Sequence, residues 1–358
     1  VISTEARYNE ISEYNFKKRE IHNGVQIFRV KVGNIDKNNF FKRSHQLLKS
    51  SLSLFFKTFK NIKKNDTVLV VTNPTFLILL MPIIKYIKRI SYTLLVHDIF
   101  PENFVAIGGI KSTSYTFKIL KKIFDKAYSY SDTCISIGRD MSDVINKKTG
   151  DKGNVKFIPN WSDIEDVYPI KKNKTKLYLQ LFKEGDFVFQ FAGNLGHAQG
   201  LDNIINTIKL INNPEINFLF IGGGAKYDKI KEFSKNNKNV KVIGYQDRKT
   251  QNDFLNACDI AIVTLSDGMY GLGVPSKSYN IMAAGKPLLM IGDERSEIAL
   301  CIKEYNLGWV VKPDDIESLK STIELIYNNR NKLDIIAKNT RKVAEEVFSK
   351  TQILDKYY

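Results

Sequence analysis

Residues 187–205 read FVFQFAGNLGHAQGLDNII, and this stretch contains the pattern on which the fold depends. A mostly apolar run ends at Gly193, a loop with two further glycines follows, and an amphipathic helix then begins. A short apolar run that leads into a helix is typical of a parallel strand buried on both faces. Glycines at such a turn let the backbone approach a ligand closely, although they serve equally well in an ordinary tight turn.

The same alternation of short apolar runs and helical stretches continues along the chain in both directions. The predicted strands are 25–30, 67–72, 92–97, 133–137 and 155–159 in the first half, and 187–193, 217–224, 240–245, 260–265, 287–292 and 308–311 in the second. Strands that alternate with helices in this way form parallel sheets wrapped by helices. We therefore predict an α/β protein with two Rossmann-like, doubly wound domains that face a central cleft.

A polar, lysine-rich stretch near 166–180 separates the two series of strands. Because 358 residues exceed the usual size of one hydrophobic core, two domains are expected. We predict an N-terminal domain over 1–168 and a C-terminal domain over 169–344. The chain begins with VIST, which resembles the end of a strand, so we expect that the first strand of the N-terminal domain is missing.

The composition indicates a globular protein with an uneven positive charge, since 43% of residues are hydrophobic and 26% are charged. Residues 1–168 contain 27 Lys and Arg against 16 Asp and Glu, which predicts an acidic partner for this half. The three cysteines are far apart and fit neither a zinc site nor a disulfide framework, so a reducing cytoplasm is expected. The longest apolar run, 75–84, is about half the length that crosses a bilayer.

The segment 37–64 contains eight basic residues and no acidic one. Its apolar residues recur at helical spacing, which predicts an apolar stripe beside a cationic face. The stripe comprises Leu48, Leu52, Phe55, Phe59 and Ile62. Such a helix can lie on an anionic membrane surface, or it can pack on a core with its lysines in solvent. Nucleic acid is disfavoured, because no basic stripe with stacking aromatic residues continues through the other motifs.

The segment GVPSKSYNIMAAGKP at 273–287 places a lysine between two serines at the start of a predicted helix, 276–284. Free amides, hydroxyls and an ammonium at a helix start attract phosphate, so we predict that Ser276, Lys277 and Ser278 bind a diphosphate. A solvated surface lysine is the alternative. Glu297, at the next predicted helix start, either accepts hydrogen bonds from ribose hydroxyls or caps its own helix.

In the first half, His97 and Asp98 stand at the carboxyl end of a predicted strand, and Glu102 follows in a loop interrupted by proline. Ligands of open α/β sheets bind beyond the carboxyl ends of strands, so these three residues are candidates for proton transfer or substrate recognition. A structural histidine is the alternative. His197 falls in a similar loop of the second half. The glycines at 222–224 lack the dinucleotide fingerprint, which disfavours a redox cofactor.

Four segments, taken together and in this order, resemble glycosyltransferase family 4. They are IPNW at 158–161, GN-G--QGL at 193–201, PSK-Y-IMAAGKP at 275–287 and SEI at 296–298. The resemblance spans nearly the whole chain and implies a GT-B fold, with an acceptor-binding N-terminal domain and a C-terminal nucleotide-sugar domain. It also implies that a final helix, 345–358, returns to the first domain. More narrowly, the segments are similar to the bacterial O-antigen and capsule branch, which includes N-acetyl-L-fucosamine transferases.

This resemblance implies a retaining transferase that uses no metal or other cofactor. The donor would be a UDP-sugar, N-acetylated in this branch, and the acceptor a lipid-diphosphate-linked saccharide at the inner face of the cell membrane. His97 and Asp98 match the acceptor side of the family. The implied donor-binding residues are Gly193, Asn194, Gly196, Gln199, Gly223, Gly244, Tyr245, Ser276, Lys277, Ser278, Asn280 and Glu297.

The chain departs from the family pattern at four of its positions. Asn194 and Gln199 stand where many members have an arginine and a lysine, and Leu272 and Asn280 stand where they have two glutamates. Lys277 is therefore expected to carry more of the phosphate charge. Two other functions stay open on these residues: a non-catalytic sugar-nucleotide-binding subunit of a transferase complex, and a UDP-sugar epimerase of the same fold.

Overall fold

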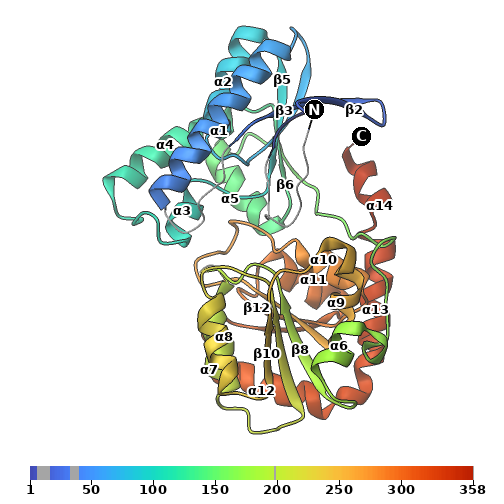
Figure 1. The fold of residues 1–358 in the computed structure, drawn as a ribbon. Coiled ribbons are helices and arrows are strands. Elements are labelled where there is room, and N and C mark those ends of the chain that lie inside the picture. The colour runs from blue at the N-terminus through green and yellow to red at the C-terminus, as the bar shows by residue number, and fades with distance from the viewer. Residues whose placement is uncertain (6–16, 33–39, 197–198, 358) are drawn as a thin grey trace. The chain divides into compact units, whose positions relative to one another are not determined.

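The computed structural model describes residues 1–5, 17–32, 40–196 and 199–357, which divide into two compact units (Figure 1). Unit 1 comprises residues 1–137 and 141–157, and unit 2 comprises residues 138–140 and 158–358. The boundary lies at 157/158 and not at 168, because the buried Ser162 donates a hydrogen bond to the Tyr279 carbonyl at 2.7 Å. Residues 345–358 also cluster with unit 2, where the Ser162 amide donates to the Phe348 carbonyl.

Unit 2 contains a six-stranded parallel sheet of order β10-β9-β8-β11-β12-β13. Its strands are β8 (Phe187–Ala192), β9 (Ile216–Ile221), β10 (Val240–Ile243), β11 (Ile260–Thr264), β12 (Leu288–Ile291) and β13 (Gly308–Val311). All six match predicted strands. Because the strand order reverses between β8 and β11, the sheet is doubly wound and its ligand edge is expected at that point.

Helices flank this sheet on both faces (Figure 1). They are α6 (Lys176–Leu181), α7 (Leu201–Ile208), α8 (Tyr227–Lys235), α9 (Gln251–Asn256), α10 (Lys277–Ala283), α11 (Glu297–Tyr305), α12 (Ile316–Asn328) and α13 (Leu333–Glu346). The short helix α14 (Lys350–Leu354) also belongs to unit 2 and lies beyond the end of α13, away from the sheet (Figure 1). The core between sheet and helices is rich in phenylalanine, and the Phe189 and Phe218 rings stack at 5.6 Å. Full burial of each such ring contributes roughly 1.5–3 kcal/mol to the free energy of unfolding, so this core stabilises the sheet.

The described part of unit 1 contains two sheets. The larger is parallel, of order β4-β5-β6-β7, with β4 (Thr67–Val71), β5 (Ser91–Val96), β6 (Thr133–Ser136) and β7 (Val155–Phe157). The smaller, of order β1-β3-β2, contains β1 (Ile2–Thr4), β2 (Arg19–His22) and β3 (Val25–Val30). The strand predicted at 25–30 therefore belongs to the smaller sheet, where β2 pairs with it antiparallel.

In the described part of unit 1, five helices accompany these sheets. They are α1 (Phe40–Asn61), α2 (Leu77–Lys88), α3 (Glu102–Ala106), α4 (Tyr115–Ser129) and α5 (Arg139–Thr149). α1 is the helix predicted within 37–64, of which residues 37–39 lie outside the described residues. It packs on α2 with Leu47 and Leu54 buried, and α2 packs in turn on α4. No described helix combines the length and the apolar character that a membrane crossing requires.

Candidate functional site

The carboxyl ends of β8 and β9 approach each other through glycines. Gly222 has φ +135°, and a Cβ at this position would lie 1.9 Å from the Gly193 carbonyl oxygen, so no larger residue fits. Gly193 itself has φ +148° and donates its amide to the Ile221 carbonyl at 2.8 Å. The Leu195 amide donates to the Gly223 carbonyl at 2.9 Å. The two loops are thus fixed side by side at this edge of the sheet.

Lys277, the first residue of α10, reaches this pair of loops. Its Nζ lies 3.5 Å from the centroid of the Phe191 ring and 3.3 Å from the place that a Cβ on Gly193 would occupy. No hydrogen bond or ion pair joins the ammonium to another residue in the described part of the chain. Burial without a counter-charge lowers the pKa of Lys277 to about 7. An anion beside Nζ would supply the counter-charge that no described residue provides.

Other predicted donor residues surround the same loops. The Tyr245 hydroxyl donates to the Gly223 carbonyl at 2.9 Å, and its ring covers Gly223 so closely that a Cβ there would lie 2.6 Å from the ring. Asn194 is exposed, and its amide lies against Gly196. The Gln199 carbonyl accepts from the Thr264 hydroxyl at the end of β11. These residues therefore share the carboxyl edge of the sheet in unit 2.

Gly244 and His197 were also predicted to lie in loops at this edge of the sheet. Gly244 directly follows β10, and a Cβ on it would meet no atom within 4 Å, so the backbone is open to approach there. His197 lies outside the described residues.

The two serines beside Lys277 differ in their surroundings. Ser276 is exposed and forms no side-chain cap on α10. Ser278 is fully buried, and its hydroxyl donates to the Pro275 carbonyl at 2.8 Å. A hydroxyl that is both buried and already bonded cannot turn to a phosphate without losing its partner. We therefore remove Ser278 from the predicted diphosphate ligands and retain Ser276.

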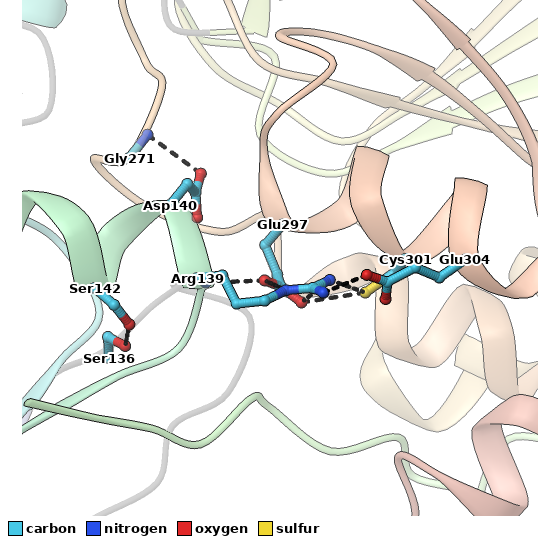
Figure 2. Close-up of polar contacts among 8 residues, drawn as sticks. All are labelled: Ser136, Arg139, Asp140, Ser142, Gly271, Glu297, Cys301 and Glu304. Atoms are coloured by element: carbon cyan, nitrogen blue, oxygen red, sulfur yellow. Dashed lines mark hydrogen bonds and ion pairs between the residues drawn. The ribbon is translucent and has the colours of Figure 1, made fainter.

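Glu297 is buried, and Arg139 occupies both of its carboxylate oxygens (Figure 2). Oε2 accepts from the Arg139 amide and from Nε, each at 2.9 Å, and Oε1 accepts from Nη2 at 3.2 Å. The Cys301 thiol also donates to Oε1 at 3.2 Å. Both carboxylate oxygens of Glu297 already accept two hydrogen bonds, so none is left for a ribose hydroxyl. We therefore remove Glu297 from the predicted ribose-binding residues.

Arg139 and Asp140 are not among the predicted site residues, and the contacts of the chain place both in unit 2. Arg139 also pairs with Glu304 (Figure 2). Burial lowers the pKa of Arg139, but the hydrogen bonds that it donates to Glu297 and Glu304 outweigh this effect and raise the pKa above its ordinary value. The buried Asp140 accepts from the Gly271 amide at 3.2 Å. No local pattern signals these contacts, since 158 residues separate Arg139 from Glu297.

Asn280 also has a structural partner. Its Oδ1 accepts from the Asp163 amide at 3.0 Å, in the segment that follows the boundary between the units. The side-chain NH₂ group is the part of this amide that remains for a ribose hydroxyl.

In unit 1, His97 and Asp98 directly follow β5. Both of their backbone amides donate to the Thr72 hydroxyl, at 3.1 and 3.3 Å, and Asn103 donates to the Asp98 carboxylate at 3.1 Å. Burial lowers the pKa of His97, against the opposite influence of Asp98. Burial likewise raises the pKa of Asp98. The His97 imidazole is therefore uncharged at neutral pH and able to accept a proton.

Glu102 lies at the start of α3, not in a loop as predicted, and takes part in a network of ion pairs. Both of its carboxylate oxygens contact the Lys148 ammonium, at 2.7 and 2.8 Å, and Lys121 lies at 3.3 Å. The Lys148 side chain is 1% exposed and also pairs with Asp125 at 2.6 Å. Removal of one partner from such a buried network is costly, which indicates a structural role. We therefore remove Glu102 from the catalytic candidates.

The cysteines Cys134, Cys258 and Cys301 are all unpaired and buried. Burial raises the pKa of the Cys134 thiol to about 11 and that of Cys258 to about 12, so neither is a thiolate at neutral pH. Within the described ranges, no group of three or more His, Cys, Asp or Glu side chains is placed to hold a metal ion.

Comparison with known proteins identifies the family. The sequence model described as glycosyl transferases group 1 matches residues 174–343, which include the glycine loops and Lys277. The probable glycosyltransferase WbjE of Pseudomonas aeruginosa is 36% identical over 297 residues, which cover 80% of this chain and 74% of that protein. The chain belongs to the glycosyl transferases group 1 family. This glycosyltransferase is also 24% identical over 234 residues to the putative colanic acid biosynthesis glycosyl transferase WcaI of Escherichia coli K12, covering 63% of this chain and 56% of that protein.

Solved structures resemble this glycosyltransferase in fold. Sucrose-phosphate synthase from Thermosynechococcus elongatus aligns with a TM-score of 0.73 at 15% identity, over 96% of this chain and 84% of that one. Anabaena HepE in complex with UDP aligns with a TM-score of 0.72 at 17% identity, over 92% and 84%. The fold is thus GT-B, an α/β fold with two Rossmann-like units, as the sequence predicted.

Proposed function

We propose that this glycosyltransferase is a retaining, metal-independent enzyme of family 4 that transfers an N-acetylated sugar from a UDP-sugar to a lipid-diphosphate-linked saccharide. It would act in bacterial O-antigen, lipopolysaccharide or capsule biosynthesis, in the cytoplasm at the inner face of the cell membrane. The observation that carries this proposal is the Lys277 ammonium over the glycine loops at the carboxyl ends of β8 and β9, where no described residue pairs with it. A pyrophosphate beside it would find a positive charge and accessible backbone at the same place.

The proposed donor site lies in unit 2. Lys277 and the exposed Ser276 would bind the diphosphate, and the closely approaching loops at Gly193 and Gly223 would bring backbone amides to it. The open Gly244 and the neighbouring Tyr245 would hold the base, and the Asn280 amide would donate to ribose. Departure of the nucleoside diphosphate leaves negative charge on it, and Lys277 would stabilise that charge in the transition state.

The proposed acceptor residues, His97 and Asp98, lie in unit 1. The uncharged imidazole of His97 would orient or deprotonate the acceptor hydroxyl, and Asp98 would stabilise the imidazolium that results. The positively charged segment 37–64 would bring the enzyme to the anionic membrane in which the acceptor lies.

Names of similar proteins support the proposal without deciding it. HepE has been solved with UDP and with UDP-glucose, WcaI is named for colanic acid biosynthesis, and WaaG, at a TM-score of 0.66 and 11% identity, for lipopolysaccharide biosynthesis. Each of these names describes the similar protein itself and not this chain. Together they favour a nucleoside-diphosphate sugar as donor and a cell-surface saccharide as product.

A panel of nucleotides tests the proposed function. The purified chain is heated with UDP, GDP and their sugars, and only the preferred nucleotide should raise the melting temperature, because ligand at a hundredfold excess over Kd adds about 2.7 kcal/mol to the free energy of unfolding. The preferred UDP-sugar is then incubated with a lipid-diphosphate-linked saccharide, and release of UDP is measured. If no uridine nucleotide raises the melting temperature, the donor assignment is wrong.

The same assay separates two alternatives. A non-catalytic nucleotide-sugar-binding subunit would bind the donor without releasing UDP, and the amide at Asn280 in place of a family glutamate favours that outcome. A UDP-sugar epimerase would convert the donor to an isomer in the absence of any acceptor. Transfer to the acceptor excludes both.

Donor affinity should depend on pH through Lys277. The pKa of about 7 in the empty protein means that donor binding above pH 7 must take up a proton, because the diphosphate favours the charged lysine. The Kd should stay constant below pH 7 and rise by up to about tenfold per pH unit above it, measured by calorimetry between about pH 6 and about pH 8.5. A UDP-sugar is the suitable ligand, since its diphosphate diester does not titrate in this range.

Donor affinity should fall as the pH rises above 7, whereas the stability of the empty protein should rise. An unfolded lysine has its ordinary pKa of 10.5 and the folded one about 7, so the unfolded state binds more protons between these values. The contribution of Lys277 to the free energy of unfolding therefore rises with pH across that window.

For the donor, a Kd that does not change with pH would contradict a contact between Lys277 and the diphosphate.

A further inference from the structure

Three neighbouring helices of unit 1 each expose an apolar stripe. Leu48, Leu52 and Phe56 recur at every fourth position of α1, with Phe56 66% exposed. The stripes on α2 and α4 comprise Ile83, Tyr86 and Ile87, and Tyr115, Ile119 and Ile123. Tyr86 is 87% exposed and Tyr115 is 79% exposed. Because α2 packs on both α1 and α4, the stripes belong to one layer of helices (Figure 1).

Basic residues accompany the apolar stripes. The three helices contain eleven Lys and Arg residues and one acidic residue, Asp125, which already pairs with Lys148 and Lys121. A shallow hollow along α1 is lined by Leu48, Leu52 and Phe56 together with Lys49. A second hollow, at the ends of α1 and α2, is lined by Ile62, Lys63, Lys64, Ile87, Lys88 and Arg89. Apolar and positively charged groups therefore occur together on this layer.

We propose that the exposed faces of α1, α2 and α4 form one docking surface for an anionic lipid bilayer. Phe56, Tyr86 and Tyr115 enter the interface between headgroups and acyl chains, and Lys63, Lys64 and Arg89 bind lipid phosphates. This inference rests on the proposed function, which places the acceptor in a membrane, and it goes beyond the segment 37–64 by adding α2 and α4.

The charge and chemistry of the surface favour lipid over other occupants. A second copy of the chain would bring two strongly positive faces together, which the repulsion of like charges opposes. A nucleic acid would pair with the basic residues but would leave Ile83, Ile87, Ile119 and Ile123 against a polar backbone. A bilayer with anionic headgroups satisfies both kinds of group at once.

Vesicle sedimentation of the full chain tests the surface. Binding should be strong to vesicles of phosphatidylcholine with phosphatidylglycerol, weak to phosphatidylcholine alone, and weaker in high salt. The variant Phe56→Ser/Tyr86→Ser/Tyr115→Ser should lower the partition coefficient at least tenfold. The variant Lys63→Gln/Lys64→Gln/Arg89→Gln should lower it by about fivefold per residue, or about a hundredfold in total.

A control variant removes three exposed apolar residues from unit 2. Leu179, Leu325 and Ile335 are 63%, 54% and 72% exposed, and their combined replacement by serine should leave vesicle binding unchanged. Binding of a UDP-sugar without vesicles is measured on every variant and should not change, so failure of the docking surface is distinguishable from failure of the donor assignment. Equal binding of the wild type and both surface variants would overturn the proposal. So would a wild type that forms dimers through this face and does not bind vesicles.

Discussion

Replacement of Lys277 by methionine should lower kcat/KM for the UDP-sugar by about a hundredfold to a thousandfold, the usual range for the loss of one preorganised group that stabilises developing charge. The free energy of unfolding should stay the same or increase. The physical reason is that the Lys277 ammonium is desolvated against the Phe191 ring and forms no ion pair with another described residue, so it is a cost to the empty protein and a benefit only when an anion is bound.

The same segment offers a matched control in Lys286. Burial lowers the pKa of this lysine too, but it lies beside Asp259 and Cys258, at the start of β12 and not at its carboxyl end. Lys286→Met should alter the thermal midpoint and leave kcat/KM and its pH dependence as they are. If Lys277→Met and Lys286→Met had equal effects on turnover, the assignment of the diphosphate to Lys277 would be refuted.

Loss of Arg139 should be the most destabilising single change in unit 2 among those that involve a charge. Arg139→Met leaves the Glu297 carboxylate, only 2% exposed, without its cation, and breaking a buried pair in this way costs about 3–5 kcal/mol. The double variant Arg139→Met/Glu297→Gln should recover part of this loss, because the uncompensated charge is then absent. Urea unfolding of the full chain measures both effects as shifts of the midpoint.

Arg295 provides the comparison for this prediction. It lies two residues before Glu297 and pairs with Asp293 at 2.7 Å, but its side chain is 68% exposed. An exposed pair of this kind contributes at most about 1 kcal/mol, so Arg295→Met should shift the midpoint little. Similar shifts for Arg139→Met and Arg295→Met would mean that the buried pair contributes no more than a surface one.

The sequence was sufficient to predict the sheet of unit 2 and insufficient for parts of unit 1. Strands such as β8 and β9 are buried on both faces, so each is a continuous apolar run that stands out from its surroundings. β2, with the sequence REIH, is largely exposed and pairs antiparallel, and it carries no such run. The helix α6 was predicted to be part of a linker because lysines surround its short apolar stretch.

In the candidate site, too, residues that belong to a local sequence pattern could be predicted, whereas contacts between residues distant in sequence could not. The positions of Gly193, Tyr245 and Lys277 at the carboxyl edge of the sheet could be predicted, because each follows a strand or begins a helix within a recognisable segment. The surroundings of Glu297 and Glu102 could not be predicted, because their partners Arg139 and Lys148 are distant in sequence and carry no local signature. Whether a carboxylate is free for a substrate depends on such partners, which only the folded chain reveals.

The membership of residues 138–140 in unit 2 has a consequence for any attempt to express unit 2 alone. A gene fragment that encodes 158–358 would omit Arg139 and Asp140, although the rest of unit 2 is continuous in sequence. Glu297 and the Gly271 amide would then lose their partners inside an otherwise intact fragment. A fragment design that joins a short GRD-containing peptide to residue 158 would restore both, and it would correspond to the folding unit more faithfully than the contiguous segment does.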